Sequence, residues 1–393
     1  MANVSSSNGL EKYPKLRFKG FSEPYMVVPL GDIACEVNRT DPNSKAPVMM
    51  LSAGNGFIMQ SEKYSRDNAG QSLKKYTLLK KGELAYNHGA SKAKQFGCCY
   101  QLELDEALVP FVYHCFGVNN EYAPYISTVL NLSTTERQLK RLVSSSVRMD
   151  GLLNISYDDY MTVELALPSL DEQQKVSCFL SLLDEKIKKQ QRLVEHLKKY
   201  KRGFFKSIIS GQFANIGFDT AKWERKCLSE LFSISAGGDI DKDRFSPIQS
   251  ESHPYPVYAN AKTNDGLYGY ANYYKSQENT ITVSGRGEVG FAVARRTKYV
   301  PIVRLLSLVP KEPLDIDFYT LIINNTNIFV ESTGVPQLTS PQLGKLIVPY
   351  APLEEQRKIA KIFNGIDVRI ANSEKELDAL YLLRQSLLNK VFI

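Results

Sequence analysis

The glycine-rich run GRGEVG, residues 285–290, is the clearest place in the chain where side-chain chemistry could be presented by a loop. It places Arg286 between two glycines, and an arginine in such a loop suits two-pronged reading of guanine or the clamping of a phosphate. The run also matches the G-x-G-x-x-G pattern of dinucleotide sites, but those sites need a helix next and an acidic residue about 20 positions on. Here the strand-like FAVAR follows, without a suitable acidic residue, so we expect a strand-to-strand turn. A solvated hairpin arginine explains Arg286 almost equally well.

A second stretch, YANAKTN at residues 258–264, is rich in amide and hydroxyl groups. Asparagine can form two hydrogen bonds with adenine, and lysine can reach guanine or phosphate. An ordinary Asn/Gly turn is the slightly better explanation for any single residue of this stretch. The candidate nucleic-acid contacts in the second half are Asn260, Lys262, Asn264, Arg286 and Arg295.

The first half of the chain has a basic stretch but no clear copy of GRGEVG. Charged runs are usually solvated faces, yet here aromatic and amide residues are interleaved with the lysines, which makes a nucleic-acid surface about as good an explanation. The candidate contacts in this half are Lys74, Lys75, Asn87, His88, Lys92 and Lys94.

Motifs for catalysis are missing. The sequence contains no N-P-P-[YF], no G-x-S-x-G and no G-x-x-x-x-G-K-[ST]. Glu224-Arg225-Lys226 fits the E-x-K part of a nuclease motif but lacks a clear P-D partner. The six Cys form no C-x-x-C pair and the four His form no H-x-x-x-H pair, so we expect no metal site and a cytoplasmic, reduced setting. We predict a chain that is not itself an enzyme.

Two long helices must position these candidates. LDEQQKV at 170–176 reappears as LEEQRKI at 353–359, and the two copies align without a gap up to residues 210 and 393. Apolar residues recur in steps of four and three, which is the heptad seam of a coiled coil. Two unrelated amphipathic helices would explain one such seam; two seams with polar breaks at the same places favour a duplication. We expect an antiparallel pair with the seam residues Val176, Leu180, Leu183, Ile187, Val194, Leu197, Ile359, Phe363, Ile366, Ile370, Leu377 and Leu380.

The remaining sequence indicates two globular halves of mixed α/β structure. Short β-branched runs such as Ile281–Val283 are separated by Gly and Asn turns. The net charge of +7 is mild for 393 residues and permits an acidic partner without requiring one. No apolar run is long enough to span a membrane, and MANVSSSNG does not read as a signal peptide. The predicted fold is α+β with a pseudo-two-fold internal repeat, in the order domain (1–170), helix (171–210), domain (211–352) and helix (353–393).

This plan resembles the specificity subunit of type I restriction-modification systems over essentially the whole chain. The resemblance depends on the twice-used L-x-E-Q-x-K-[IV], which follows a proline closely in each copy, the opening KLRFKGF and the run from Tyr255 to Arg295. It implies that each globular half is a target-recognition domain reading one part of a split, asymmetric site in double-stranded DNA. It further implies that the helices set the spacing and dock two methyltransferase subunits, through which the restriction and motor subunits join.

By the same resemblance, this chain binds no cofactor, while S-adenosylmethionine, ATP and Mg²⁺ belong to the partner subunits. The principal alternative is a coiled-coil scaffold that binds proteins and no DNA. A divergent methyltransferase fused to its own recognition domain is a more remote one.

Overall fold

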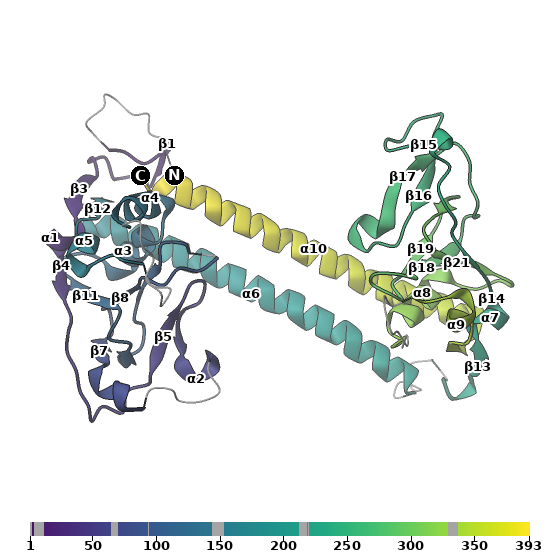
Figure 1. The fold of residues 1–393 in the computed structure, drawn as a ribbon, viewed down its shortest axis with the longest axis horizontal. Helices are drawn as coiled ribbons and strands as arrows, with labels where there is room; N and C mark the ends of the chain where they lie inside the picture. Colours follow the sequence, from purple (N-terminus) through teal and green to yellow (C-terminus); the bar gives the residue numbers. More distant parts are fainter. Residues whose placement is uncertain are drawn as a thin grey trace. The chain divides into compact units, whose positions relative to one another are not determined.

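The computed structural model describes residues 2–3, 12–63, 70–92, 94–143, 153–211, 218, 220–328 and 337–393 (Figure 1). Most of the N-terminal stretch MANVSSSNG, residues 1–9, therefore lies outside the described residues. The chain forms two compact units: unit 1 contains residues 1–191 and 376–393, and unit 2 contains residues 192–375. Each long helix contributes residues to both units. These helices are α6 (Leu170–Ile209) and α10 (Leu353–Val391).

Besides its parts of α6 and α10, unit 1 contains short strands and helices. Its four-stranded sheet has the order β4-β11-β8-β9, and its remaining strands pair two by two. The elements are β1 (Ala2–Asn3), β2 (Leu16–Arg17), β3 (Met26–Pro29), α1 (Leu30–Ile33), β4 (Ala34–Glu36), β5 (Met49–Ser52), β6 (Gly56–Met59), α2 (Gln60–Lys63), η1 (Gly70–Lys75), β7 (Thr77–Lys80), β8 (Leu84–Asn87), β9 (Cys98–Gln101), β10 (Glu106–Val109), β11 (His114–Val118), α3 (Ala123–Leu130), α4 (Ser133–Leu142), α5 (Tyr157–Met161) and β12 (Glu164–Leu167).

Unit 2 has two four-stranded sheets, with the orders β14-β21-β18-β19 and β15-β17-β16-β20. Its elements are η3 (Thr220–Lys222), β13 (Glu224–Cys227), α7 (Leu228–Leu231), β14 (Phe232–Ala236), η4 (Lys242–Arg244), β15 (Phe245–Ser246), β16 (Tyr255–Tyr258), η5 (Thr263–Gly266), β17 (Leu267–Ala271), β18 (Thr280–Val283), β19 (Ala292–Arg295), β20 (Val300–Pro301), β21 (Leu306–Pro310), α8 (Ile316–Asn324), α9 (Ser340–Gly344) and β22 (Ile347–Tyr350).

The two units repeat one framework. In unit 1, strand β3 pairs with β12 just before α6 begins, and the chain leaves β3 through the short helix α1 into the edge strand β4. In unit 2, β13 pairs with β22 just before α10, and α7 leads into the edge strand β14. The sheets β4-β11-β8-β9 and β14-β21-β18-β19 then have the same strand order, all antiparallel. The predicted α+β class, internal repeat and long-helix pair are confirmed.

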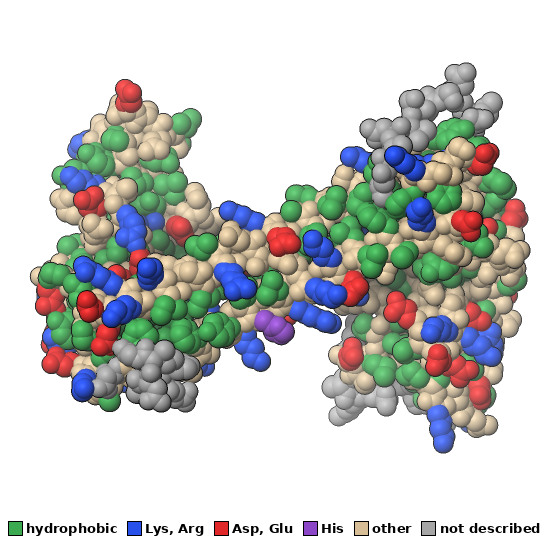
Figure 2. All heavy atoms as spheres, turned by 180° about the vertical axis from the view of Figure 1, so that it is seen from behind, with side chains coloured by type: hydrophobic (Ala, Val, Ile, Leu, Met, Phe, Trp, Pro, Cys, Tyr) green, Lys and Arg blue, Asp and Glu red, His purple; other side chains and the backbone are tan. Residues whose placement is uncertain are grey.

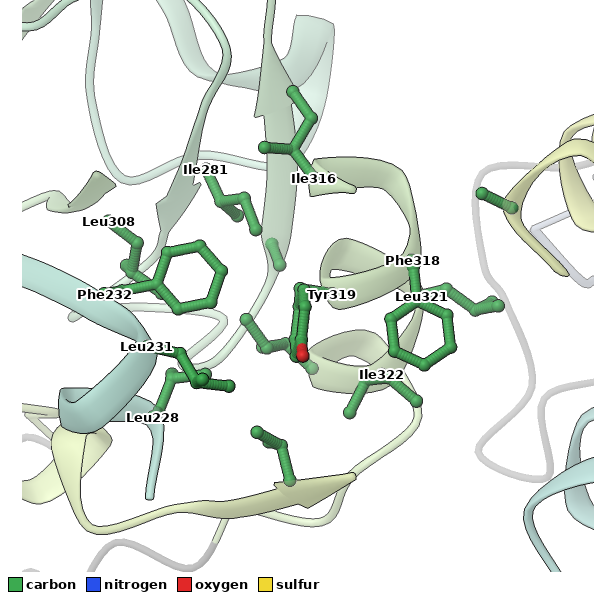
Figure 3. Close-up of a cluster of buried hydrophobic side chains, with 14 of the residues drawn as sticks. Leu228, Leu231, Phe232, Ile281, Leu308, Ile316, Phe318, Tyr319, Leu321 and Ile322 are labelled. Atoms are coloured by element: carbon green, nitrogen blue, oxygen red, sulfur yellow. The ribbon is translucent and has the colours of Figure 1, made fainter. Parts of the chain in front are cut away.

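Each unit buries apolar residues from both long helices. In unit 2, Phe205 and Ile208 at the end of α6 join the same core as Ile359 and Phe363 at the start of α10. Figure 3 shows part of this core, in which the ring of Phe232 faces helix α8. In unit 1, the last turn of α10 and the first turns of α6 pack into one core with Tyr125, and Figure 1 shows the C-terminus lying against unit 1. The end of each helix is therefore part of a globular core as well as of a helix pair.

The seam predicted from the heptads is largely buried. Nine of its twelve residues are buried, and Leu197, Ile366 and Leu377 are half-buried. Leu183, Ile187, Leu377 and Leu380 form a helix-to-helix cluster within unit 1. The polar seam position Gln190 is buried as well, as is its counterpart in the second copy.

Matched ion pairs join the helices in both units. In unit 1, Arg384 Nη2 of α10 donates to Asp184 Oδ2 of α6 at 3.0 Å. In unit 2, Lys201 Nζ of α6 donates to Asp367 Oδ2 of α10 at 2.7 Å. Because Lys201 and Arg384 occupy the same repeat position, as do the two aspartates, the duplication has produced the same contact twice. In both units the helices run antiparallel, since later residues of one helix meet earlier residues of the other.

The glutamine of the repeated Glu-Gln pair makes equivalent contacts at the start of each long helix. Gln173 is buried, and its Oε1 accepts the backbone N–H of Tyr122, the residue before α3, at 3.1 Å. Gln356 is also buried, and its Oε1 accepts the N–H of Asp315, the residue before α8, at 2.9 Å. Each amide also donates to the backbone carbonyl five residues before it, at 2.9 and 2.8 Å. The glutamine thus fixes the start of the long helix and caps an equivalent helix in each unit.

No helix in the described part of the chain combines the length and the apolar character needed to cross a lipid bilayer.

Candidate nucleic-acid interface

In unit 2 the GRGEVG run forms the tight turn between β18 and β19, as predicted. Ser284 closes the turn: its N–H donates to Phe291 O, and its carbonyl accepts from Gly290 N–H, both at 2.9 Å. Gly287 and Gly290 have φ values of 70° and 87°, which favour glycine. The turn leaves Arg286 exposed, with its Nη2 donating to Gln337 Oε1 at 3.0 Å. The guanidinium is accessible for bidentate contact once this exposed hydrogen bond is given up.

Asn260 supports this turn from a neighbouring loop. Its Oδ1 accepts the N–H of Gly285 at 2.8 Å, and its Nδ2 donates to the carbonyl of Val303. Both ends of the amide are therefore bonded inside unit 2, which is the geometry of a positioning residue. Its candidacy for adenine contact stays a prediction, and it requires these bonds to rearrange.

Lys262 and Asn264 lie at the surface beside the turn. Lys262 Nζ is 4.0 Å from Glu288 and 5.7 Å from the centre of the Phe291 ring, while the side chain is 64% exposed. Asn264 is exposed and has a φ of 50°, a left-handed conformation that asparagine tolerates. Both side chains are available to a large ligand.

Arg295 occupies an interior position. Its Nε donates to Thr282 Oγ1 at 2.8 Å, its Nη2 donates to Asp265 O at 2.6 Å, and its guanidinium lies 3.5 Å from the centre of the Tyr258 ring. Burial lowers the pKa of this arginine, and the nearby tyrosines and Asp265 act in the opposite direction. The side chain is only 6% exposed, so this geometry supports an internal bracing role. The nucleic-acid contact expected of Arg295 stays a prediction.

In unit 1 the basic stretch divides between two places. Lys74 and Lys75 are exposed at the end of η1. Asn87, at the end of β8, accepts the N–H of Gly89 with its Oδ1 at 2.9 Å and so shapes the loop that leads to β9. Lys92 is exposed in that loop.

Two further candidates in this loop already have partners within unit 1. Lys94 Nζ donates to Glu136 Oε1 and to Asn131 O, each at 2.7 Å. His88 is buried, with its ring centre 4.9 Å from that of His114. Burial lowers the pKa of His114, whose Nε2 lies 3.0 Å from Ile155 O.

The β8–β9 loop, residues 88–97, is the counterpart of the GRGEVG turn. It joins the same two strands of the same sheet order, and a backbone bond ties each loop to the segment before a short helix. Leu153 N–H donates to His88 O at 2.9 Å before α5, and Leu338 N–H donates to Gly285 O at 2.8 Å before α9. The sequence analysis missed this equivalence because the two loops differ in length and share no recognisable motif. The flanking strands and the similar segments before α5 and α9 are the features of the sequence that could have indicated this equivalence.

Charge does not gather into one field on the face drawn in Figure 2. Lys and Arg side chains lie interspersed with Asp and Glu there, as the mild net charge suggests. With a net charge of only +7 over 393 residues, local groups such as the two matched loops are the better candidates for recognising an acidic ligand.

Comparison with known proteins supports one family. The model of the family "Type I restriction modification DNA specificity domain" matches residues 220–381. A Mycoplasma pneumoniae protein named as a type I specificity subunit is 26% identical over 212 residues. The second half of the chain is thus similar in sequence to the type I specificity subunits. A protein of Methanocaldococcus jannaschii, named as the specificity subunit of type I restriction enzyme MjaX, is 23% identical over 83% of this chain and 81% of its own length.

The match to the M. pneumoniae specificity subunit covers 54% of this chain and 57% of that relative, so the chain spans about half the length of the relative. Among solved structures, the S subunit of a type I restriction-modification system from M. genitalium has a similar fold. Its TM-score is 0.61 at 15% identity, and the match covers 97% of this chain and 99% of that one.

Proposed function

We propose that this chain is the sequence-specific DNA-recognition subunit of a type I restriction-modification complex and performs no catalysis itself. One observation carries the proposal: the chain uses one framework twice and places a different loop between the same two strands in each unit. Two copies of one reader with different contact residues suit a split, asymmetric site in double-stranded DNA. A scaffold that binds proteins alone would have no use for two unlike loops on matched frameworks.

The long helices have a second role in this proposal. They set the spacing between the two half-sites and dock two methyltransferase subunits, and the restriction and motor subunits join through these. S-adenosylmethionine, ATP and Mg²⁺ act on those partners. Exposed apolar side chains along the helices, such as Leu182 at 60%, Val368 at 61% and Leu382 at 68%, support protein docking there.

Exchanging one recognition segment tests the modular reading. We expect that replacing residues 211–352 by the corresponding segment of another specificity subunit changes one half of the methylated sequence and leaves the other half intact. The donor segment must pack on Phe205, Ile208, Ile359 and Phe363, which the helices contribute to the core of unit 2. The readout is methylation sequencing of DNA from cells that supply the methyltransferase subunit. A change in both half-sites together would contradict the proposal.

Arg286 offers a residue-level test of the same proposal. If it reads guanine, Arg286→Ala should cost about 1–3 kcal/mol of binding free energy at one base pair only. If it holds a phosphate, the variant should weaken binding to all sequences alike, and Arg286→Lys should restore most of the loss. Binding of the subunit with its methyltransferase to duplexes with single-base changes separates the two roles. Arg296→Ala is the control, since Arg296 is paired with Asp317. Unchanged binding to every duplex would remove Arg286 from the interface.

A further inference from the structure

The turn between β20 and β21 in unit 2 has an unusual backbone for its sequence. Leu305 N–H donates to Ile302 O at 3.0 Å, which closes a four-residue β-turn. Its two central residues, Val303 and Arg304, have φ values of 53° and 65°. Positive φ at both positions is the pattern of a type I′ turn, which normally takes Asn or Gly. A β-branched valine is disfavoured in this conformation, so the local backbone does not explain its presence.

The surrounding structure holds the turn in place. Val303 N–H donates to Gly238 O at 2.9 Å, and Arg304 N–H donates to Gly237 O at 3.0 Å. A Cβ at Gly237 would lie 2.6 Å from the backbone of Pro301, so a larger residue could not support the turn this closely. Strained residues that are fixed in this way tend to cluster at functional sites.

The turn adjoins the GRGEVG turn directly. Asn260 bonds to both, through Gly285 N–H and Val303 O. A Cβ on Gly285 would stand 2.8 Å from Arg304 O, so the two backbones touch. Val303 is 49% exposed, and Arg304 is exposed, with no side-chain hydrogen bond or ion pair to another residue in the described part of the chain. The turn that carries the exposed Val303 and Arg304 side chains therefore adjoins the turn that carries Arg286.

Unit 1 has a similar feature at the matching place. Tyr113 N–H donates to Pro110 O at 3.0 Å, closing a turn just before β11, as the Val303 turn precedes β21. Phe111 in that turn is 56% exposed. Because β11 and β21 hold equivalent positions in the two sheets, the two turns lead into equivalent strands, and each turn carries an exposed apolar side chain.

We propose that the Ile302–Leu305 turn is a second specificity element of unit 2, in which Val303 contacts an apolar base edge and Arg304 contacts a neighbouring phosphate. The C5-methyl group of thymine in the major groove is the base feature that suits a valine. A phosphate contact suits an unpaired arginine beside a base-reading side chain. This inference rests on the proposed function and names the groups in the DNA that this part of unit 2 reads.

Val303→Asn provides the test, because asparagine fits the left-handed backbone while removing the apolar tip. We expect the melting temperature to be unchanged or higher. We also expect discrimination at one base pair of one half-site to fall about fivefold or more, the lower end of the effect of a mismatched base pair. Arg304→Gln should weaken binding to all duplexes alike and lower the salt slope of binding by about one. Both measurements use the chain together with its methyltransferase subunit.

Asn279→Gly is the matched control, since Asn279 also has a positive φ, of 56°, but lies at the other end of β18. It should leave the methylated sequence unchanged. Val303→Gly repeats the test if the asparagine variant does not fold. A folded Val303 variant with wild-type discrimination at every position would overturn the inference, while the wild-type complex would still methylate a defined site. A wild-type complex without any sequence preference would instead overturn the proposed function, and the inference with it.

Discussion

Replacing Glu172 by alanine is expected to lower the free energy of unfolding of unit 1 by about 3–5 kcal/mol, because it leaves a buried arginine without its counter-charge. Glu172 and Arg17 are 1% and 3% exposed, and two hydrogen bonds of 2.9 and 2.7 Å join them. Burial by itself would lower the pKa of Arg17, but the hydrogen bond and charge of Glu172 raise it above its usual value. Urea unfolding, with hydrogen exchange followed for peptides of each unit, measures the loss.

Glu355 is the matched control, because it is the same residue of the repeat in unit 2. Its carboxylate accepts the indole N–H of Trp223 at 2.9 Å and is half-buried. Glu355→Ala should cost only about 0.5–1.5 kcal/mol, the net value of one hydrogen bond. Replacing both members of the first pair, as Arg17→Met with Glu172→Leu, should recover much of the lost stability. Equal losses from Glu172→Ala and Glu355→Ala would show that the buried pair has no special weight.

The long helices were predictable because their pattern is periodic and local. The expected ranges 171–210 and 353–393 correspond to observed helices at Leu170–Ile209 and Leu353–Val391. Apolar residues that recur in steps of four and three are typical of paired helices and fit few other structures. The heptads did not reveal that both helix ends enter globular cores, because those contacts join residues far apart in sequence, such as Tyr125 and Phe392 with ring centres 5.2 Å apart.

The Glu-Gln signature shows how far a repeated sequence predicts a repeated structure. The glutamines do the same work in both units, capping α3 and α8. The glutamates do not, because Glu172 meets a buried arginine while Glu355 meets a tryptophan. The residue that each glutamate contacts lies in a globular half, and the two halves have diverged. The helix sequences alone therefore do not predict these contacts.

The candidate site was predictable only in part. The turn that exposes Arg286 follows from its glycines, since the conformation they permit is local. The burial of Arg295 depends on the ring of Tyr258 and on Thr282 from the adjacent strand, which spacing alone does not indicate. Val303 was missed for the opposite reason: its residue type argues against a turn, and the bonds to Gly237 and Gly238 that support the turn come from far away in the sequence.

Inserting one heptad into each long helix is expected to widen the gap between the two half-sites by about three base pairs without changing either sequence. The insertions, after Gln190 and after Ser373, fall close to the borders between the units at 191/192 and 375/376. Both helices continue through these borders without a break. The matched ion pairs Arg384–Asp184 and Lys201–Asp367 lie outside the segment between the two insertion points. The contacts Gln191–Tyr381 and Lys198–Glu374 adjoin the insertions, and we expect new contacts to replace them. Seven residues add about 10 Å of helix and keep the apolar seam in phase. DNA rises about 3.4 Å per base pair along one strand, which gives the expected three base pairs.

Methylation sequencing of the insertion variant, with its methyltransferase subunit supplied, measures the gap directly. A four-residue insertion at the same places is the control, because it adds helix but turns the apolar stripe away from its partner. That variant should lose stability and activity, whereas the heptad variant should keep both. If the heptad variant folds, methylates DNA and retains the original gap, some part of the complex other than the helix pair sets the spacing. A gap that grows by about three base pairs in the heptad variant would instead assign the spacing to α6 and α10.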